Sequence, residues 1–227
     1  MRKRLLVYCE GRTEEMFVER LLRNYLPRGV KVERPVLAAT SRDPRARRGG
    51  FVNWDVIEFD LRQQFAADAD PDLRFTTLLD VFRIPDSVPG MAAITSPLTA
   101  VADIESVESA IEQALSEPRF KAYLQRHELE ALLLADMPAL ERVFCRHTGD
   151  IQQLAADIAA FANAEDINHG AGTHPAARLA VAIPGYEDLK ASNAYFVLAE
   201  AGLPSIRSKC PRFDAWLRHW ETWGAGS

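Results

Sequence analysis

The chain has 227 residues, of which 48% are apolar and 26% are charged, and its formal net charge is −5. These proportions indicate a folded protein with a substantial core, and the negative balance excludes a generally basic coat for nucleic acid, so any such binding has to be local. No apolar run approaches the length of a membrane span, and three widely spaced cysteines without a CxxC pair favour a reducing cytoplasm.

The first strand is expected at residues 5–9, a short continuous apolar run that ends at Glu10. Gly11 follows, and Thr13 is suited to cap a helix that begins there and stops before Pro27. This helix carries an apolar stripe of Phe17, Leu21, Leu22 and Leu26. The opening of the chain therefore predicts a buried strand followed by a helix that covers it.

A second strand is expected at residues 30–39, with an interruption at Pro35. It is followed by a polar loop at 41–50, a helix at 53–67 and a buried third strand at 75–82, near whose end lies Asp80. The loop carries Arg42, Arg45, Arg47 and Arg48, which could grip phosphates or lie solvated on the surface.

A loop at 85–97, an amphipathic helix at 104–116 and a fourth strand at 120–125 complete this alternation of strands and helices. Such alternation predicts an α/β fold with a mostly parallel sheet flanked by helices. After residue 137 only helices are expected, among them 151–164, 195–201 and 213–223. The predicted organisation is an α/β core at 1–136 and a helical C-terminal portion at 137–227 that packs on the core.

Acidic residues follow several of the predicted strands, and in an open α/β sheet ligands bind at the carboxyl ends of the strands. Glu10 ends the first strand, Asp80 lies near the end of the third, and Glu14 stands in the first turn of the first helix. Carboxylate oxygens suit Mg²⁺ or Mn²⁺, and two such ions can generate a hydroxide and neutralise a leaving phosphate oxygen.

Three further residues complete this hypothesis. Glu128 and Glu130 follow the fourth strand and share a face only if the backbone is extended, because in a helix they diverge by about 200°. Lys209 lies just before the final helix and could stabilise a transferred phosphate electrostatically. Each has a simpler alternative: a first-turn acid for Glu14, a solvated helix face for Glu130 and a surface charge for Lys209. Asp80 is harder to explain in this way, because a buried carboxylate has to be paired or metal-bound.

Other motifs are absent from the sequence. His127 and Glu128 open an HExxH-like pattern, but Ala131 stands where the second histidine is required. No phosphate-binding GxxxxGK loop, GxGxxG motif or nucleophile elbow occurs.

The segment Cys-Glu-Gly-Arg-Thr-Glu at 9–14 resembles the first motif of Toprim domains, the topoisomerase–primase fold. Along nearly its whole length, the chain is similar to a prokaryotic Toprim-like group, domain-of-unknown-function family 4276. The matching stretches, in order, are 10–17, 76–82, 127–136, 175–179 and 206–217. The resemblance implies a compact sheet with helices on both sides and a divalent-metal site like that of Toprim nucleases.

The resemblance also implies roles for individual residues. Glu10, Glu14 and Asp80 match the family's metal-holding acids, the pair Glu128 and Glu130 matches a later acidic pair, and Lys209 matches a downstream lysine. The second Toprim motif is usually Asp-x-Asp, but Phe82 stands where the second aspartate is expected. This departure leaves a one-metal site or a non-catalytic site open.

The leading prediction is a cytoplasmic nuclease, a phosphodiesterase that uses Mg²⁺ or Mn²⁺ to act on DNA or RNA. Glu10 would be the central metal ligand or general base, and Asp80 and Lys209 would share the catalytic work. The resemblance further implies a partner ATPase in a bacterial defence system, while a homo-oligomer is compatible with the sequence. A non-catalytic adaptor that binds the ATPase is the alternative, and a small-molecule phosphohydrolase is the third hypothesis.

Overall fold

The computed structural model describes residues 3–27, 29–43, 45–95, 97–168, 170 and 172–226. The chain forms two compact units: the first unit is Met1–Gln125 with His219–Ser227, and the second unit is Arg126–Arg218. The units divide earlier than residue 136 because residues 129–135 pack against helices of the second unit. Residues 219–225 belong to the first unit because Trp223 contacts two of its strands, through Lys3 and Arg74.

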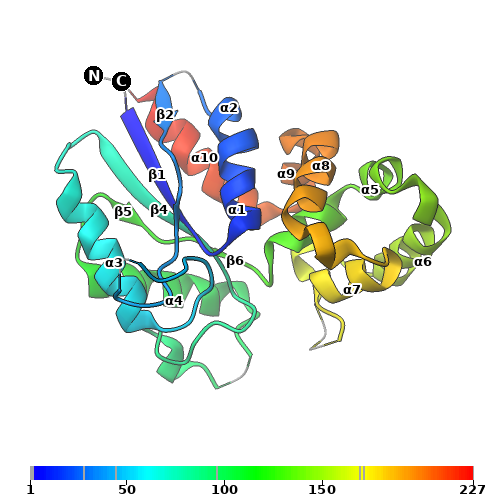
Figure 1. The fold of residues 1–227 in the computed structure, drawn as a ribbon, viewed down its shortest axis with the longest axis horizontal. Helices are drawn as coiled ribbons and strands as arrows, with labels where there is room; N and C mark the ends of the chain where they lie inside the picture. The colour runs from blue at the N-terminus through cyan, green and yellow to red at the C-terminus, as the bar shows by residue number, and fades with distance from the viewer. Residues whose placement is uncertain are drawn as a thin grey trace. The chain divides into compact units, whose positions relative to one another are not determined.

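The first unit contains a six-stranded sheet whose order is β2-β1-β4-β5, with β3 also paired to β1 and β6 also paired to β4 (Figure 1). All these pairings are parallel. The expected α/β class with a mostly parallel sheet is therefore confirmed. The strands are β1 (Lys3–Cys9), β2 (Val30–Val32), β3 (Val36–Leu37), β4 (Leu73–Asp80), β5 (Phe120–Lys121) and β6 (Leu124–Gln125).

Two of the expected strands are each split in the structure. Between β2 and β3 lies Pro35, which has no N–H to donate to a neighbouring strand. Between β5 and β6 the chain turns its donors to acids of helix α4 (Val101–Leu115): the N–H of Ala122 donates to Glu112 (3.0 Å) and that of Leu124 donates to Glu108 (2.7 Å). The breaks therefore follow from where backbone hydrogen bonds can be made.

Successive side chains of a strand point to opposite faces of the sheet, and each face of this sheet is covered by helices. Tyr8 and Phe75 lie on the face that packs in one core with α3 (Trp54–Ala67) and α4. On the opposite face, Lys3 and Arg74 contact Trp223 near the end of α10 (Pro211–Ala225). The sheet is therefore buried on both faces. Because β1 and β4 are parallel neighbours, their carboxyl ends lie at the same edge of this sheet.

The helix after β1 runs as α1 (Arg12–Phe17), a π-helical turn (Val18–Leu22) and α2 (Arg23–Tyr25). It begins before Thr13, so the prediction that Thr13 caps it is wrong: Gly11 occupies the cap position with an extended backbone. Glu14 lies in its first turn as expected, together with Glu15.

The second unit has only helices among its described residues, as the sequence predicts after residue 137. Two expected bounds change: the helix predicted at 151–164 ends at Ile158, and the one predicted at 195–201 already begins at Lys190. Within the described parts of the chain, every helix is too short or too polar to cross a membrane. The described α-helices of this unit are α5 (Met137–Val143), α6 (Thr148–Ile158), α7 (Pro175–Ala182), α8 (Lys190–Ala201), α9 (Leu203–Lys209) and the first part of α10. Its described 3-10 helices are Leu129–Ala135, Cys145–His147, Ala164–Asp166 and Tyr186–Leu189.

Candidate functional site

Glu10 and Asp80 lie side by side at the carboxyl edge of β1 and β4. The backbone N–H of Glu10 donates to the carbonyl of Leu78 (3.0 Å), which continues the pairing of the two strands by one step. The Oε2 atom of Glu10 accepts the backbone N–H of Asp80 (2.8 Å). Both residues are half-buried. The structure therefore brings together the first two acids that the sequence proposes, and it fixes the Glu10 carboxylate beside Asp80.

Glu14 reaches back toward the same end of β1. Its side chain is buried, and its Oε2 atom accepts the backbone N–H of Gly11 (2.8 Å), the residue that follows Glu10. This bond is the usual one for an acid at the third position of a helix, so the simpler role proposed for Glu14 is present. The same contact holds its carboxylate against the residue next to Glu10.

A glycine pair closes the arginine-rich loop onto Glu10. The N–H of Gly50 donates to the Glu10 carbonyl (2.7 Å), and Gly49 and Gly50 have φ angles of 106° and 114°. These positive angles favour glycine at both positions. The loop is therefore held at a fixed position beside the site.

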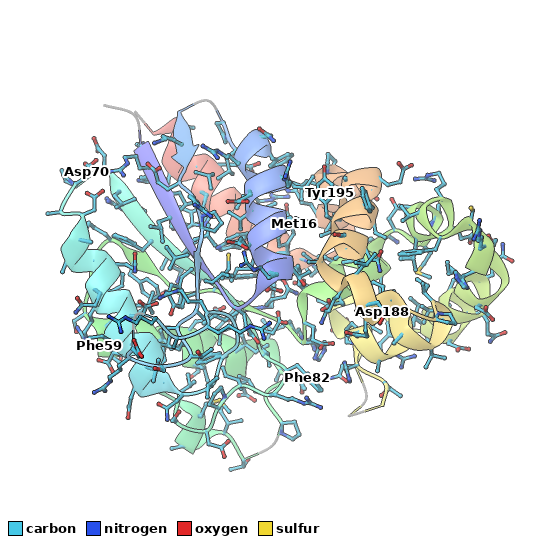
Figure 2. All side chains as sticks on the ribbon, in the orientation of Figure 1. Met16, Phe59, Asp70, Phe82, Asp188 and Tyr195 are labelled. Atoms are coloured by element: carbon cyan, nitrogen blue, oxygen red, sulfur yellow. The ribbon has the colours of Figure 1, made fainter. Side chains whose placement is uncertain are left out.

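The loop is also fixed by a buried polar cluster that the sequence did not suggest. Arg48 donates to Asp60 and to the carbonyl of Leu37 (2.7 Å), while the hydroxyl of Tyr8 donates to Asp60 (2.8 Å). Burial raises the pKa of Tyr8, so the hydroxyl remains a proton donor. Arg48 thus stabilises the fold locally. Arg42 instead lies over the ring of Phe59, which is labelled on α3 in Figure 2.

The first-unit acids Glu10 and Asp80 offer the oxygen donors that a hard divalent cation prefers. Among the described residues, however, no three His, Cys, Asp or Glu side chains are grouped so that they could hold a metal ion. Mg²⁺ does not require three protein ligands, because it is commonly bound by one or two carboxylates together with water molecules and substrate phosphates. Glu10 and Asp80 would supply those carboxylates.

The position of the missing aspartate is taken by an aromatic residue. Phe82, labelled in Figure 2, follows β4, and the guanidinium of Arg83 lies over its ring, 5.0 Å from the centroid. Asp86, the next acid along the chain, is exposed. The structure thus gives Phe82 a cation–π contact, where the Toprim motif would supply a second carboxylate.

Glu128 lies in the second unit and is held by the start of α7. Its backbone is extended, and its buried carboxylate accepts the N–H of Ala176 (3.0 Å) and lies 2.7 Å from Nδ1 of His174. Such contacts satisfy a donor at a helix N-terminus. The sequence offered one local hint of this helix start, Pro175 directly after His174.

Glu130 is only 1% exposed, so the alternative that it lies on a solvated helix face is wrong. Its Oε1 atom is 3.0 Å from Nζ of Lys190, and burial raises the pKa of its carboxyl. Burial opposes the charge on Lys190 as well, but the carboxylates of Glu130, Glu128 and Glu187 together outweigh it and raise the pKa of that lysine. The result is an ion pair between a buried carboxylate of the 3-10 helix at 129–135 and a partly buried lysine of α8. Tyr186 is buried near these charges, and its own burial raises the pKa of its hydroxyl.

Lys209, the lysine chosen from the sequence, is exposed at the end of α9. It lines a pocket of the second unit together with Asp136 and Ser205, whose hydroxyl donates to Asp136 (2.7 Å). Lys190 is the lysine that pairs with a motif acid. No local pattern singles it out, because its partner lies sixty residues earlier in the chain.

The HExxH-like segment has a structural role in the second unit. His127 is buried with a φ of 64°, and its Nδ1 atom is 3.1 Å from Nδ2 of Asn168. A left-handed backbone at a residue other than glycine costs about 1 to 3 kcal/mol, which the surrounding packing has to offset.

A family model described as "Domain of unknown function (DUF4276)" matches residues 9–221. No curated protein and no solved structure matches the chain. The family match spans both acidic groups, Glu10 with Asp80 and Glu128 with Glu130.

Proposed function

The chain belongs to the DUF4276 family, and on this premise we propose that it is a Toprim-like nuclease, a phosphodiesterase that acts on nucleic acid with bound Mg²⁺ or Mn²⁺. One observation carries the proposal: the Glu10 carboxylate is hydrogen-bonded to the N–H of Asp80 where two parallel strands end. This edge is where α/β sheets bind ligands, and paired carboxylates there are suited to a divalent ion and a phosphate.

The chain's own residues orient the acids. Glu10 is held by three backbone contacts: its N–H to Leu78, its carbonyl to Gly50 and its carboxylate to Asp80. A carboxylate fixed in this way loses little further conformational entropy when it binds an ion or accepts a proton from water. When bound, the ion would neutralise phosphate charge and lower the pKa of a water molecule.

The proposed metal-holding residues are Glu10 and Asp80, while a metal-binding role of Glu14, whose carboxylate accepts the N–H of Gly11, stays a prediction. The participation of Glu128, Glu130 and Lys209 stays a prediction, because these residues belong to the second unit and the first two have partners there. A partner ATPase belongs to the same proposal and is supported by the Toprim resemblance, and the cytoplasmic location belongs to it as the expectation drawn from the three spaced cysteines.

The test is hydrolysis of end-labelled DNA and RNA by the purified chain in Mn²⁺, with Glu10→Gln compared to the unchanged protein. We expect Glu10→Gln to reduce the rate more than about 100-fold, since even residues that only orient metal ligands are worth about 10- to 100-fold. The matched control is Asp55→Asn, an exposed acid on α3 outside the site. Hydrolysis that survives in Glu10→Gln would contradict the assignment.

A non-catalytic adaptor for an ATPase is the second candidate, and Phe82 at the expected aspartate position favours it. An adaptor would hydrolyse neither DNA nor RNA. Its Asp80→Asn variant would bind the ATPase as well as the unchanged chain does. Turnover of a small phosphodiester, with none of DNA or RNA, would instead indicate a small-molecule phosphohydrolase.

A further inference from the structure

A pocket of the first unit is lined chiefly by arginines. It is open and encloses about 580 Å³, which is within the usual range for ligand sites. Its charged side chains are four arginines and one glutamate: Arg12, Arg34, Arg47, Arg48 and Glu15. In a protein with a net charge of −5, this is a local concentration of positive charge.

The pocket lies beside the end of β1. Part of its lining is β3, whose residues Val36 and Leu37 pair with the last two residues of β1, immediately before Glu10. The loop that contributes Arg47 and Arg48 continues to Gly50, which donates to the Glu10 carbonyl (2.7 Å). A ligand in this pocket would therefore lie next to the residue that anchors the proposed catalytic edge.

The arginines differ in how firmly they are engaged. Arg48 is tied to Asp60. The side chain of Arg12 is 74% exposed and pairs with Glu15, and that of Arg34 is 82% exposed and lies 3.7 Å from Glu19. Exposed pairs of this kind are worth little, so a phosphate can replace them at small cost. Arg47 is exposed and has no ion pair among the described residues.

The three exposed arginines come from three separate segments: α1, the connection between β2 and β3, and the 41–50 loop. A guanidinium binds two phosphate oxygens at once, and guanidinia on separate segments suit a ligand with phosphates in succession. We infer that this pocket binds the phosphodiester backbone of a nucleic-acid strand and presents it to the Glu10 edge. The inference rests on the proposed function and names the residues that hold its substrate.

The experiment measures binding without hydrolysis. Fluorescence anisotropy of a labelled single-stranded oligonucleotide is followed in EDTA, at several salt concentrations, with the full chain. We expect the variant Arg12→Gln/Arg34→Gln/Arg47→Gln to weaken binding at least about tenfold. We also expect a shallower dependence on salt, by roughly 0.7 in the log–log slope for each phosphate that the variant no longer neutralises.

The matched control is Arg20→Gln/Arg23→Gln/Arg45→Gln, which removes the same charge from exposed arginines outside the pocket lining. It should change the affinity less than threefold. Equal weakening by both triple variants, or no oligonucleotide binding by the unchanged chain, would overturn the inference. Displacement of the oligonucleotide by micromolar tripolyphosphate would also overturn it, because the site would then select a small polyphosphate.

The variant Glu10→Gln separates this inference from the proposed function. If it binds the oligonucleotide as the unchanged chain does, while neither protein hydrolyses it in Mn²⁺, the pocket stands and the nuclease proposal fails. If hydrolysis depends on Glu10 but the pocket arginines do not affect binding, the opposite conclusion holds.

Discussion

The acidic motif residues of the two units differ in burial and in the partners that hold them. In the first unit, Glu10 and Asp80 are half-buried at the end of the sheet, and Glu10 accepts a backbone N–H. In the second unit, Glu128 and Glu130 are almost wholly buried and are held by a histidine, a helix N–H and a lysine of that unit. Acids of similar appearance in the sequence thus have different surroundings: one pair lies where a ligand can reach it, and the other stabilises contacts between helices.

Burial and ion pairing shift the pKa values of individual acids in opposite directions. Burial raises the pKa of Glu130, and it also raises that of Glu165, which caps the start of α10 by accepting the N–H groups of Arg212 (2.8 Å) and Phe213 (3.1 Å). In the first unit, a hydrogen bond from Arg119 lowers the pKa of Glu117. The surroundings of an acid, rather than its place in the sequence, therefore decide the direction of its pKa shift.

The largest effect on stability is expected from Glu130→Gln. The change leaves Lys190 partly buried without its counter-charge, and breaking a fully buried pair costs about 3 to 5 kcal/mol. Because one third of the Lys190 side chain is exposed, we expect a loss of about 2 to 3 kcal/mol in the free energy of unfolding. Urea denaturation followed by tryptophan fluorescence measures it.

The contrasting variant is Glu10→Gln, which should lower stability by less than about 1 kcal/mol, because a half-exposed amide can still accept the Asp80 N–H. If Glu10→Gln were as destabilising as Glu130→Gln, the comparison between the two units would break down.

A smaller effect concerns the pH dependence of stability. A raised folded-state pKa means that the folded state binds the Glu165 proton more tightly, so its contribution becomes less favourable as the pH rises from the ordinary glutamate value through the raised one. A lowered pKa has the reverse effect: the contribution of Glu117 is present above the ordinary value and is lost as the pH falls through the folded value.

The quantity to compare is the free energy of unfolding of the unchanged chain minus that of each variant. We expect this difference to fall with rising pH for Glu165→Gln and to rise with rising pH for Glu117→Gln. Denaturation curves collected from about pH 3 to about pH 7 check both signs, and slopes of the same sign would contradict these two expectations.

Much of the sheet and its edge could be predicted from the sequence. The apolar runs at 5–9 and 75–82 specify buried parallel strands, and the acids at their ends are therefore placed by the fold class itself. Pro35 correctly marked an interruption. These features depend on patterns within a few residues of the chain, which is the range in which sequence periodicity carries information.

The remaining site contacts could not be predicted in this way. Asp60 with Tyr8, His174 with Glu128 and Lys190 with Glu130 are partners between distant segments, and their contacts depend on how helices pack. Local periodicity says that Glu130 is on a helix but not that its neighbour there is a lysine. For the same reason, Lys209 stood out by its motif, while Lys190 did not.

The most direct test of the central claim is calorimetric titration of Mn²⁺ into the unchanged chain, Glu10→Gln, Asp80→Asn and Glu130→Gln. We expect Mn²⁺ to bind the unchanged chain, and we expect Glu10→Gln and Asp80→Asn each to weaken binding more than about tenfold. Glu130→Gln should bind Mn²⁺ as tightly as the unchanged chain if Glu10 and Asp80 are the protein ligands. A weaker Mn²⁺ affinity of Glu130→Gln would show that Glu130 is also a ligand. Mn²⁺ affinity that is the same in Glu10→Gln, Asp80→Asn and the unchanged chain would contradict the claim that this edge of the sheet is a metal site.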